Sequence, residues 1–108
     1  KIFLNFRGDF VTLECIVVST TPVHGTWFKN NIPLQDNADC RQIQDDKRFQ
    51  LVIKEAFVED GGIYSIKISN HAGTVTCTCK LFVREGKLKE RLNHSILFFI
   101  QNLEMSDE

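Results

Sequence analysis

Residues 60–68 read Asp-Gly-Gly-Ile-Tyr-Ser-Ile-Lys-Ile. The Gly61-Gly62 pair favours a turn, because glycine accepts backbone angles that other residues avoid. After this pair the apolar residues Tyr64, Ile66 and Ile68 alternate with polar neighbours, and a period of two is typical of a strand with one buried face. The stretch therefore predicts a turn that leads directly into a half-buried β-strand.

The period of two continues on both sides of this stretch, up to residue 84. The segments that carry it are short, rich in Val, Ile, Thr and Phe, and separated by clusters of Gly, Asn and Asp. They lie around residues 2–6, 11–17, 25–30, 49–53, 64–68 and 75–83, with a polar edge strand and loop between 35 and 47. About seven strands joined by short links predict an all-β domain, folded as a largely antiparallel β-sandwich.

A different period begins after Glu85-Gly86. The apolar residues that follow recur at steps of four, four, three and four, which is typical of an amphipathic α-helix. We therefore expect a sandwich over residues 1–84 and a helical C-terminal extension over 85–108, with the helix itself at 87–104. Its apolar stripe consists of Leu88, Leu92, Ile96, Phe99 and Leu103.

The length and charge of the chain exclude several classes of protein. It has 108 residues with 13 basic and 14 acidic side chains, a formal net charge of −1. The length fits one globular domain, and there is no excess of cations to neutralise phosphates, so we expect no nucleic-acid partner. The longest apolar run, Ile96–Ile100, is far shorter than the roughly 20 residues that cross a bilayer. We also expect no membrane partner, and Lys1 begins no sequence typical of an export leader.

The residues that could carry chemistry are scattered along the chain. His24, His71 and His94 fall in an expected loop, a hairpin turn and the helix, so they form no catalytic set of nucleophile, base and orienting group. Cys77-x-Cys79 has the wrong spacing for a zinc knuckle, and two side chains on one strand face cannot build a tetrahedral site. We therefore expect no catalytic residue, no metal and no cofactor.

Six short motifs follow one another along residues 1–84. They are Leu13-x-Cys15, Trp27-Phe28-Lys29, Leu51-x-Ile53, Asp60-x-Gly62-x-Tyr64, Asn70-x-x-Gly73 and Leu81-x-Val83. In this order they resemble an immunoglobulin domain of the intermediate set (I-set), the type found in intracellular muscle and cytoskeletal proteins such as titin, myomesin, obscurin and myosin light chain kinase. The resemblance implies an immunoglobulin-like Greek-key β-sandwich.

The resemblance also implies structural roles for the motif residues. Trp27 would fill the space between the sheets, Tyr64 would donate a hydrogen bond to the preceding turn, and Gly73 would allow a positive φ in a hairpin. The structural core expected on this basis consists of Leu13, Cys15, Trp27, Leu51, Ile53, Asp60, Gly62, Tyr64, Ile66, Gly73 and Leu81.

Two departures from the family pattern bear on function. Ile66 lies where the family has its second core cysteine, so the usual intersheet disulfide cannot form and a reduced, cytoplasmic protein is expected. A bridge from Cys15 to Cys77 or Cys79 is the open alternative. The family's edge strand before residues 2–6 is also missing. Either the chain is trimmed there, or that sheet edge is open to a strand from another chain.

The resemblance implies a non-enzymatic interaction and structural module of a larger cytoplasmic scaffold, in the sarcomere or the cytoskeleton. Its partners would be other proteins, bound through a sheet edge, the Asn70–Gly73 hairpin or the C-terminal helix. The helix would either dock on the sandwich or form an interface, including one between two copies of the chain. The alternatives are a regulatory segment beside a kinase domain and an extracellular adhesion or receptor domain that has lost its disulfide.

Overall fold

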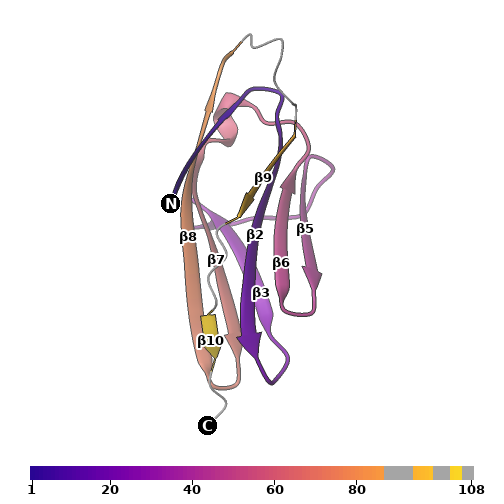
Figure 1. The fold of residues 1–108 in the computed structure, drawn as a ribbon, viewed down its shortest axis with the longest axis vertical. Helices are drawn as coiled ribbons and strands as arrows, with labels where there is room; N and C mark the ends of the chain where they lie inside the picture. Colours follow the sequence, from indigo (N-terminus) through magenta and orange to yellow (C-terminus); the bar gives the residue numbers. More distant parts are fainter. Residues whose placement is uncertain (87–93, 99–102, 106–108) are drawn as a thin grey trace.

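Two β-sheets packed face to face form the domain in the computed structural model (Figure 1). The structure describes residues 1–86 and the backbone of residues 94–98 and 103–105. One sheet has the strand order β1-β8-β7-β3-β4, and the other has the order β10-β2-β6-β5, with β9 also paired to β2. The strands are β1 (Ile2–Phe6), β2 (Phe10–Ser19), β3 (His24–Lys29), β4 (Ile32–Pro33), β5 (Cys40–Asp45), β6 (Arg48–Ile53), β7 (Gly62–Asn70), β8 (Gly73–Arg84), β9 (His94–Phe98) and β10 (Leu103–Met105), and a 3-10 turn, η1, spans Val58–Asp60.

Five of the eight strand pairs that the structure describes are antiparallel, and three of these five are hairpins. The β7–β8 hairpin extends from the pair Gly62 and Leu81 to the pair Asn70 and Gly73. β1 instead runs parallel to β8, and β9 and β10 run parallel to β2. The predicted all-β sandwich is confirmed by this arrangement.

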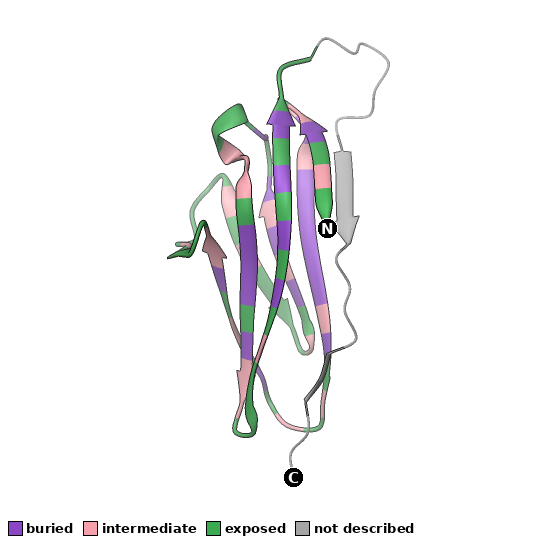
Figure 2. Ribbon diagram, turned by 90° about the vertical axis from the view of Figure 1, so that its left-hand side faces the viewer, coloured by how far each residue is buried: buried purple, intermediate pink, exposed green. Residues whose placement is uncertain are grey.

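The core lies between the sheets, and buried residues alternate with more exposed ones along β6 and β8 (Figure 2). Trp27 of β3 is 2% exposed, and Ile66 of β7 lies opposite it, fully buried. An apolar side chain therefore fills the position where the family has a cysteine. Of the residues expected in the core, Leu13, Cys15, Trp27, Leu51, Ile53, Tyr64, Ile66 and Leu81 are buried, Asp60 and Gly62 are half-buried, and Gly73 is exposed.

Hydrogen bonds within residues 57–64 fix the turn that precedes β7. The Tyr64 hydroxyl donates to the backbone carbonyl oxygen of Asp60, and the Asp60 carboxylate accepts from the N–H of Phe57 at 2.7 Å. Burial, assisted by the negative charge of Asp60, raises the pKa of Tyr64. The hydroxyl is therefore protonated at neutral pH and can serve as a donor.

The prediction of a helix at 87–104 is wrong for the positions of that range that the structure describes. Residues 94–98 and 103–105 are strands β9 and β10, paired with β2. The outer edge of β2 offers a row of backbone donors and acceptors to another strand. Residues 96–100 are rich in Ile and Phe, which favour strands as readily as helices. Long-range pairing of this kind can override a local helical period. Of the expected helical stripe, Ile96 lies in β9, Leu103 lies in β10, and Leu88, Leu92 and Phe99 lie outside the described residues.

The edges of the sheets are the places where another strand could add. Within residues 1–86, the edge strands are β1 and β4 in one sheet and β5 in the other, while β2 has β9 and β10 beside it. No helix in the described part of the chain has the length and apolar character needed to span a membrane.

Candidate interaction surface

Four large apolar side chains are exposed on the outer face of the sheet that contains β1, β8 and β7. Ile2 is 71% exposed, Leu4 53%, Ile63 45% and Phe82 44%. The strand register brings them together, since Leu4 lies opposite Phe82, and Ile2 and Ile63 lie on either side of Lys80. We call Ile2, Leu4, Ile63, Lys80 and Phe82 the β8 patch.

The sheet that carries the β8 patch has cations but no carboxylates. Its five strands contain Lys29, Lys67, Lys80 and Arg84, and no Asp or Glu. Strands β2, β5 and β6 of the other sheet carry two basic and two acidic residues. A chain that is nearly neutral as a whole therefore has one sheet that is distinctly basic.

Three of these lysines lie over aromatic rings of the same sheet, and Lys80 and Lys67 are nearer to their rings than Lys29 is to Tyr64. The Nζ atom of Lys80 lies 5.0 Å from the ring centroid of Phe82, and that of Lys67 lies 5.1 Å from the ring centroid of Phe28. An ammonium group in this position is attracted by the negative face of the ring. The two rings therefore favour side-chain conformations that keep the ammonium groups of Lys67 and Lys80 close to the surface of the sheet.

Sequence reasoning missed the β8 patch. Ile63 and Phe82 each stand beside an inward-facing residue, Tyr64 and Leu81, and so occupy the polar-face positions of their strands. The signal in the sequence was the presence of apolar residues at positions where the alternation of each strand predicts an outward-facing polar residue. Their contact with β1 depends on the parallel pairing of β1 and β8, which a period of two does not reveal.

The β7–β8 hairpin was expected to be a binding surface. It is held by the side chain of Asn70, whose Oδ1 accepts from the N–H groups of Ala72 at 2.8 Å and Gly73 at 3.2 Å. The hydroxyls of Ser69 and Thr74 also hydrogen-bond at 2.8 Å. These hydrogen bonds use the Oδ1 atom of Asn70 and the hydroxyls of Ser69 and Thr74 within the hairpin.

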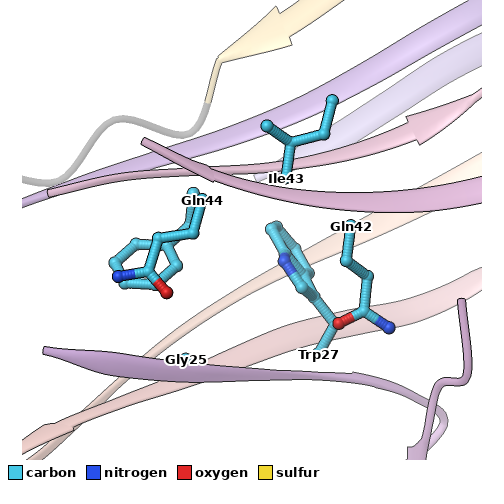
Figure 3. A pocket seen from close by; sticks show the side chains of 6 residues that line it. Gly25, Trp27, Gln42, Ile43 and Gln44 are labelled. Carbon is cyan, nitrogen blue, oxygen red and sulfur yellow. The ribbon is translucent and has the colours of Figure 1, made fainter. Parts of the chain in front are cut away.

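A cavity of about 160 Å³ opens between β3 and β5 (Figure 3). Gln42 Nε2 donates to the carbonyl oxygen of Leu34, and Gln44 Nε2 donates to that of Val23, both at 3.0 Å. The two amides therefore join β5 to segments that flank β3. The cavity is also smaller than the roughly 300 Å³ at which small-molecule sites begin. The cavity is lined by Gly25, Trp27, Gln42, Ile43, Gln44 and Phe49.

The four cysteines are free thiols in the structure, and three of them are buried in the core. A hydrogen bond with Cys15 lowers the pKa of Cys77, whereas burial raises the pKa of Cys79 to about 11. Burial and the nearby charges of Asp60 and Asp36 raise the pKa of Cys40. Ile66 lies directly opposite Cys77 in the sheet.

The residues considered for chemistry do not converge in the structure. His24 is in β3 and His71 is in the β7–β8 turn, both exposed, and His94 is in β9. Among the residues that the structure describes, no group of three or more His, Cys, Asp or Glu side chains could hold a metal ion.

The two-sheet sandwich and the hydrogen bond from Tyr64 to the preceding turn are typical of one class of protein. The family model described as "Immunoglobulin I-set domain" matches residues 6–83, and the chain belongs to this family. Palladin of Mus musculus is 36% identical over 85 residues, which cover 71% of this chain and 6% of palladin. Myotilin of Mus musculus is 35% identical over 80 residues, which cover 72% of this chain and 16% of myotilin. The chain thus spans only a small part of the length of these relatives.

Similar solved structures include domains of titin. The titin M3 domain is 28% identical, with a TM-score of 0.69 and coverage of 77% of this chain and 88% of that one. A chain from the complex of titin M10 with an obscurin-like 1 immunoglobulin domain has a TM-score of 0.74 at 22% identity, with coverage of 81% and 89%, and this likeness shows the fold alone. The predicted I-set resemblance is confirmed, and the relatives are scaffold proteins of muscle and the cytoskeleton.

Proposed function

We propose that this domain is a non-enzymatic protein-binding module of a larger scaffold in the cytoplasm of muscle or other cytoskeleton-rich cells. The observation that carries the proposal is the cluster of exposed apolar side chains in the β8 patch. Contiguous apolar surface of this kind is uncommon on domains that have no partner, and it often marks a protein interface.

The relatives and the thiols support the same function. Palladin, myotilin and the M-line assembly protein unc-89 of Caenorhabditis elegans are scaffold or assembly proteins. Free thiols at all four cysteines favour a reducing compartment, because oxidising compartments select for disulfides in small domains.

The proposal is tested by capturing proteins from muscle lysate with the domain as bait. Phe82→Ser removes an apolar ring that is 44% exposed, and Ile43→Ser on β5 is a matched control at 45% exposure. We expect the wild type and the control to retain the same set of proteins, and Phe82→Ser to lose most of them. Urea denaturation of each bait shows whether it is folded. Equal recovery by folded Phe82→Ser would contradict a function through this surface, and recovery of no protein by the wild type would contradict the binding function itself.

A further inference from the structure

The chemistry of a partner can be read from the charge around the β8 patch. Lys80 lies inside the patch, between Ile2 and Ile63, and the exposed Arg84 follows Phe82 by two residues on the same strand face. The patch therefore has an apolar centre with cations in it and beside it. A complementary surface would have apolar side chains surrounded by carboxylates.

Lys67, Lys80 and Arg84 form no ion pair with another residue of the described range 1–86. Within residues 1–86, the ion pairs join Arg7 to Glu85, Lys47 to Asp46 and Arg48 to Asp45, and none includes Lys67, Lys80 or Arg84. The strands of the sheet supply no Asp or Glu that could pair with them. The charges on this face are thus available to an external partner.

The ammonium group of Lys80 is also partly positioned before any partner binds. Its location 5.0 Å from the Phe82 centroid restricts the side chain to the surface of the patch. A side chain that is already restricted loses less conformational entropy when it forms an ion pair with a partner. This favours charge contacts at the centre of the surface instead of only at its rim.

A second copy of the chain is a poor occupant for this surface. A symmetric dimer would place the same patch on both sides of the interface, so that Lys80 and Arg84 of one copy would face those of the other. Like charges brought together in an interface oppose association. The basic sheet therefore favours a different protein.

We propose that the β8 patch, with Arg84 beside it, binds an acidic protein surface that carries apolar side chains among its carboxylates. This rests on the proposed protein-binding function and adds the chemistry of the partner. Phe82, Leu4 and Ile63 bury against the apolar side chains, and Lys80 and Arg84 pair with the carboxylates.

The experiment uses two synthetic ten-residue peptides, one of alternating Glu and Val and one of alternating Lys and Val. Each is added to isotope-labelled full chain, and amide resonances are followed by NMR. We expect the acidic peptide alone to shift residues of β1, β7 and β8, with binding that weakens as salt rises. Lys80→Glu/Arg84→Glu should weaken binding at least tenfold. Arg41→Glu/Arg48→Glu, which changes the net charge equally on the other sheet, should leave binding within twofold of the wild type.

Several results would overturn the proposal. They are equal binding of the lysine peptide, shifts centred on β5 and β6, no binding of the acidic peptide at millimolar concentration, or a dimer in sedimentation that Phe82→Ser abolishes. The lysate capture keeps the two proposals distinct. If partners are captured in a Phe82-dependent way while the acidic peptide does not bind, the domain is a binding module and only the acidic partner is wrong.

Discussion

Gly25 is a position where adding one methyl group should lower the stability of the core. A Cβ atom at Gly25 would lie 2.6 Å and 2.7 Å from two ring carbons of Phe49 and 3.2 Å from Cδ1 of Ile66. Carbon atoms in contact are normally about 3.5–4.0 Å apart, so the Phe49 ring would have to move by about 1 Å. Phe49 is 2% exposed and Ile66 is fully buried, so the ring could move only toward the cavity between β3 and β5, at the cost of its present packing.

The expected cost of Gly25→Ala follows from two opposing effects. Overpacking of a dense core costs about 1–3 kcal/mol, while replacing glycine by alanine restricts the unfolded chain and returns about 0.4–1 kcal/mol. We therefore expect a net loss of about 1–2 kcal/mol in the free energy of unfolding. Leucine in place of Phe49 removes the ring carbons that the new Cβ atom would meet. Gly25→Ala should therefore lower the free energy of unfolding much less in a Phe49→Leu background.

Urea denaturation, followed by the fluorescence of Trp27, measures this loss. Trp27 is the one tryptophan of the chain and is 2% exposed, so its emission reports on opening of the core. Thr26→Ala, at the adjacent exposed position of β3, is the control and should change stability by less than about 0.5 kcal/mol. A Gly25→Ala protein as stable as the wild type, or a cost unchanged by Phe49→Leu, would refute the close approach of β3 to Phe49.

Three further changes test other parts of the domain. Tyr64→Phe should cost about 1 kcal/mol, measured by urea denaturation at pH 7. Because the folded pKa of Tyr64 is raised above its ordinary 10.0, the wild type should lose stability as the pH rises above 10, and the variant should lose less. Asp9→Ala should cost about 2–3 kcal/mol, since the buried carboxylate accepts from Asn5 Nδ2 and the Phe6 N–H, both at 3.0 Å, and an equally stable variant would contradict this. In native protein, iodoacetamide should modify the half-buried Cys40 first, and mass spectrometry after denaturation without reductant should find four modified thiols, whereas fewer would reveal a disulfide.

The features that the sequence predicted well are those with a strong local pattern. Tyr64 and Ile66 lie in a run with a clear period of two behind a glycine turn, and Trp27 lies in a short strand of its own. Each is buried between the sheets. Their inward direction follows from the pleat of a strand, which places alternate residues on opposite faces. The fold class could therefore be predicted from the residues themselves.

The features that were missed depend on which strands become neighbours. Leu4 and Phe82 are 78 positions apart in the chain. They lie side by side only because β1 pairs with β8 in parallel in the register that places them opposite each other. The segment at 94–98 has apolar spacing that fits a helix, and its strand conformation depends on the free edge of β2. Pairing between distant segments depends on the assembled sheet and leaves no local period in the sequence.

The parallel pairing of β1 and β8 also has a mechanical consequence. Five register pairs, from Ile2 with Lys80 to Phe6 with Arg84, join the two strands. When two parallel strands are pulled from the start of one and the end of the other, the force acts along the strands, across the direction of their hydrogen bonds. Tension applied between residues 2 and 84 would therefore load the bonds of all five pairs together, so that they must rupture at once. The antiparallel β7–β8 hairpin, pulled at its open end, would instead separate one pair at a time.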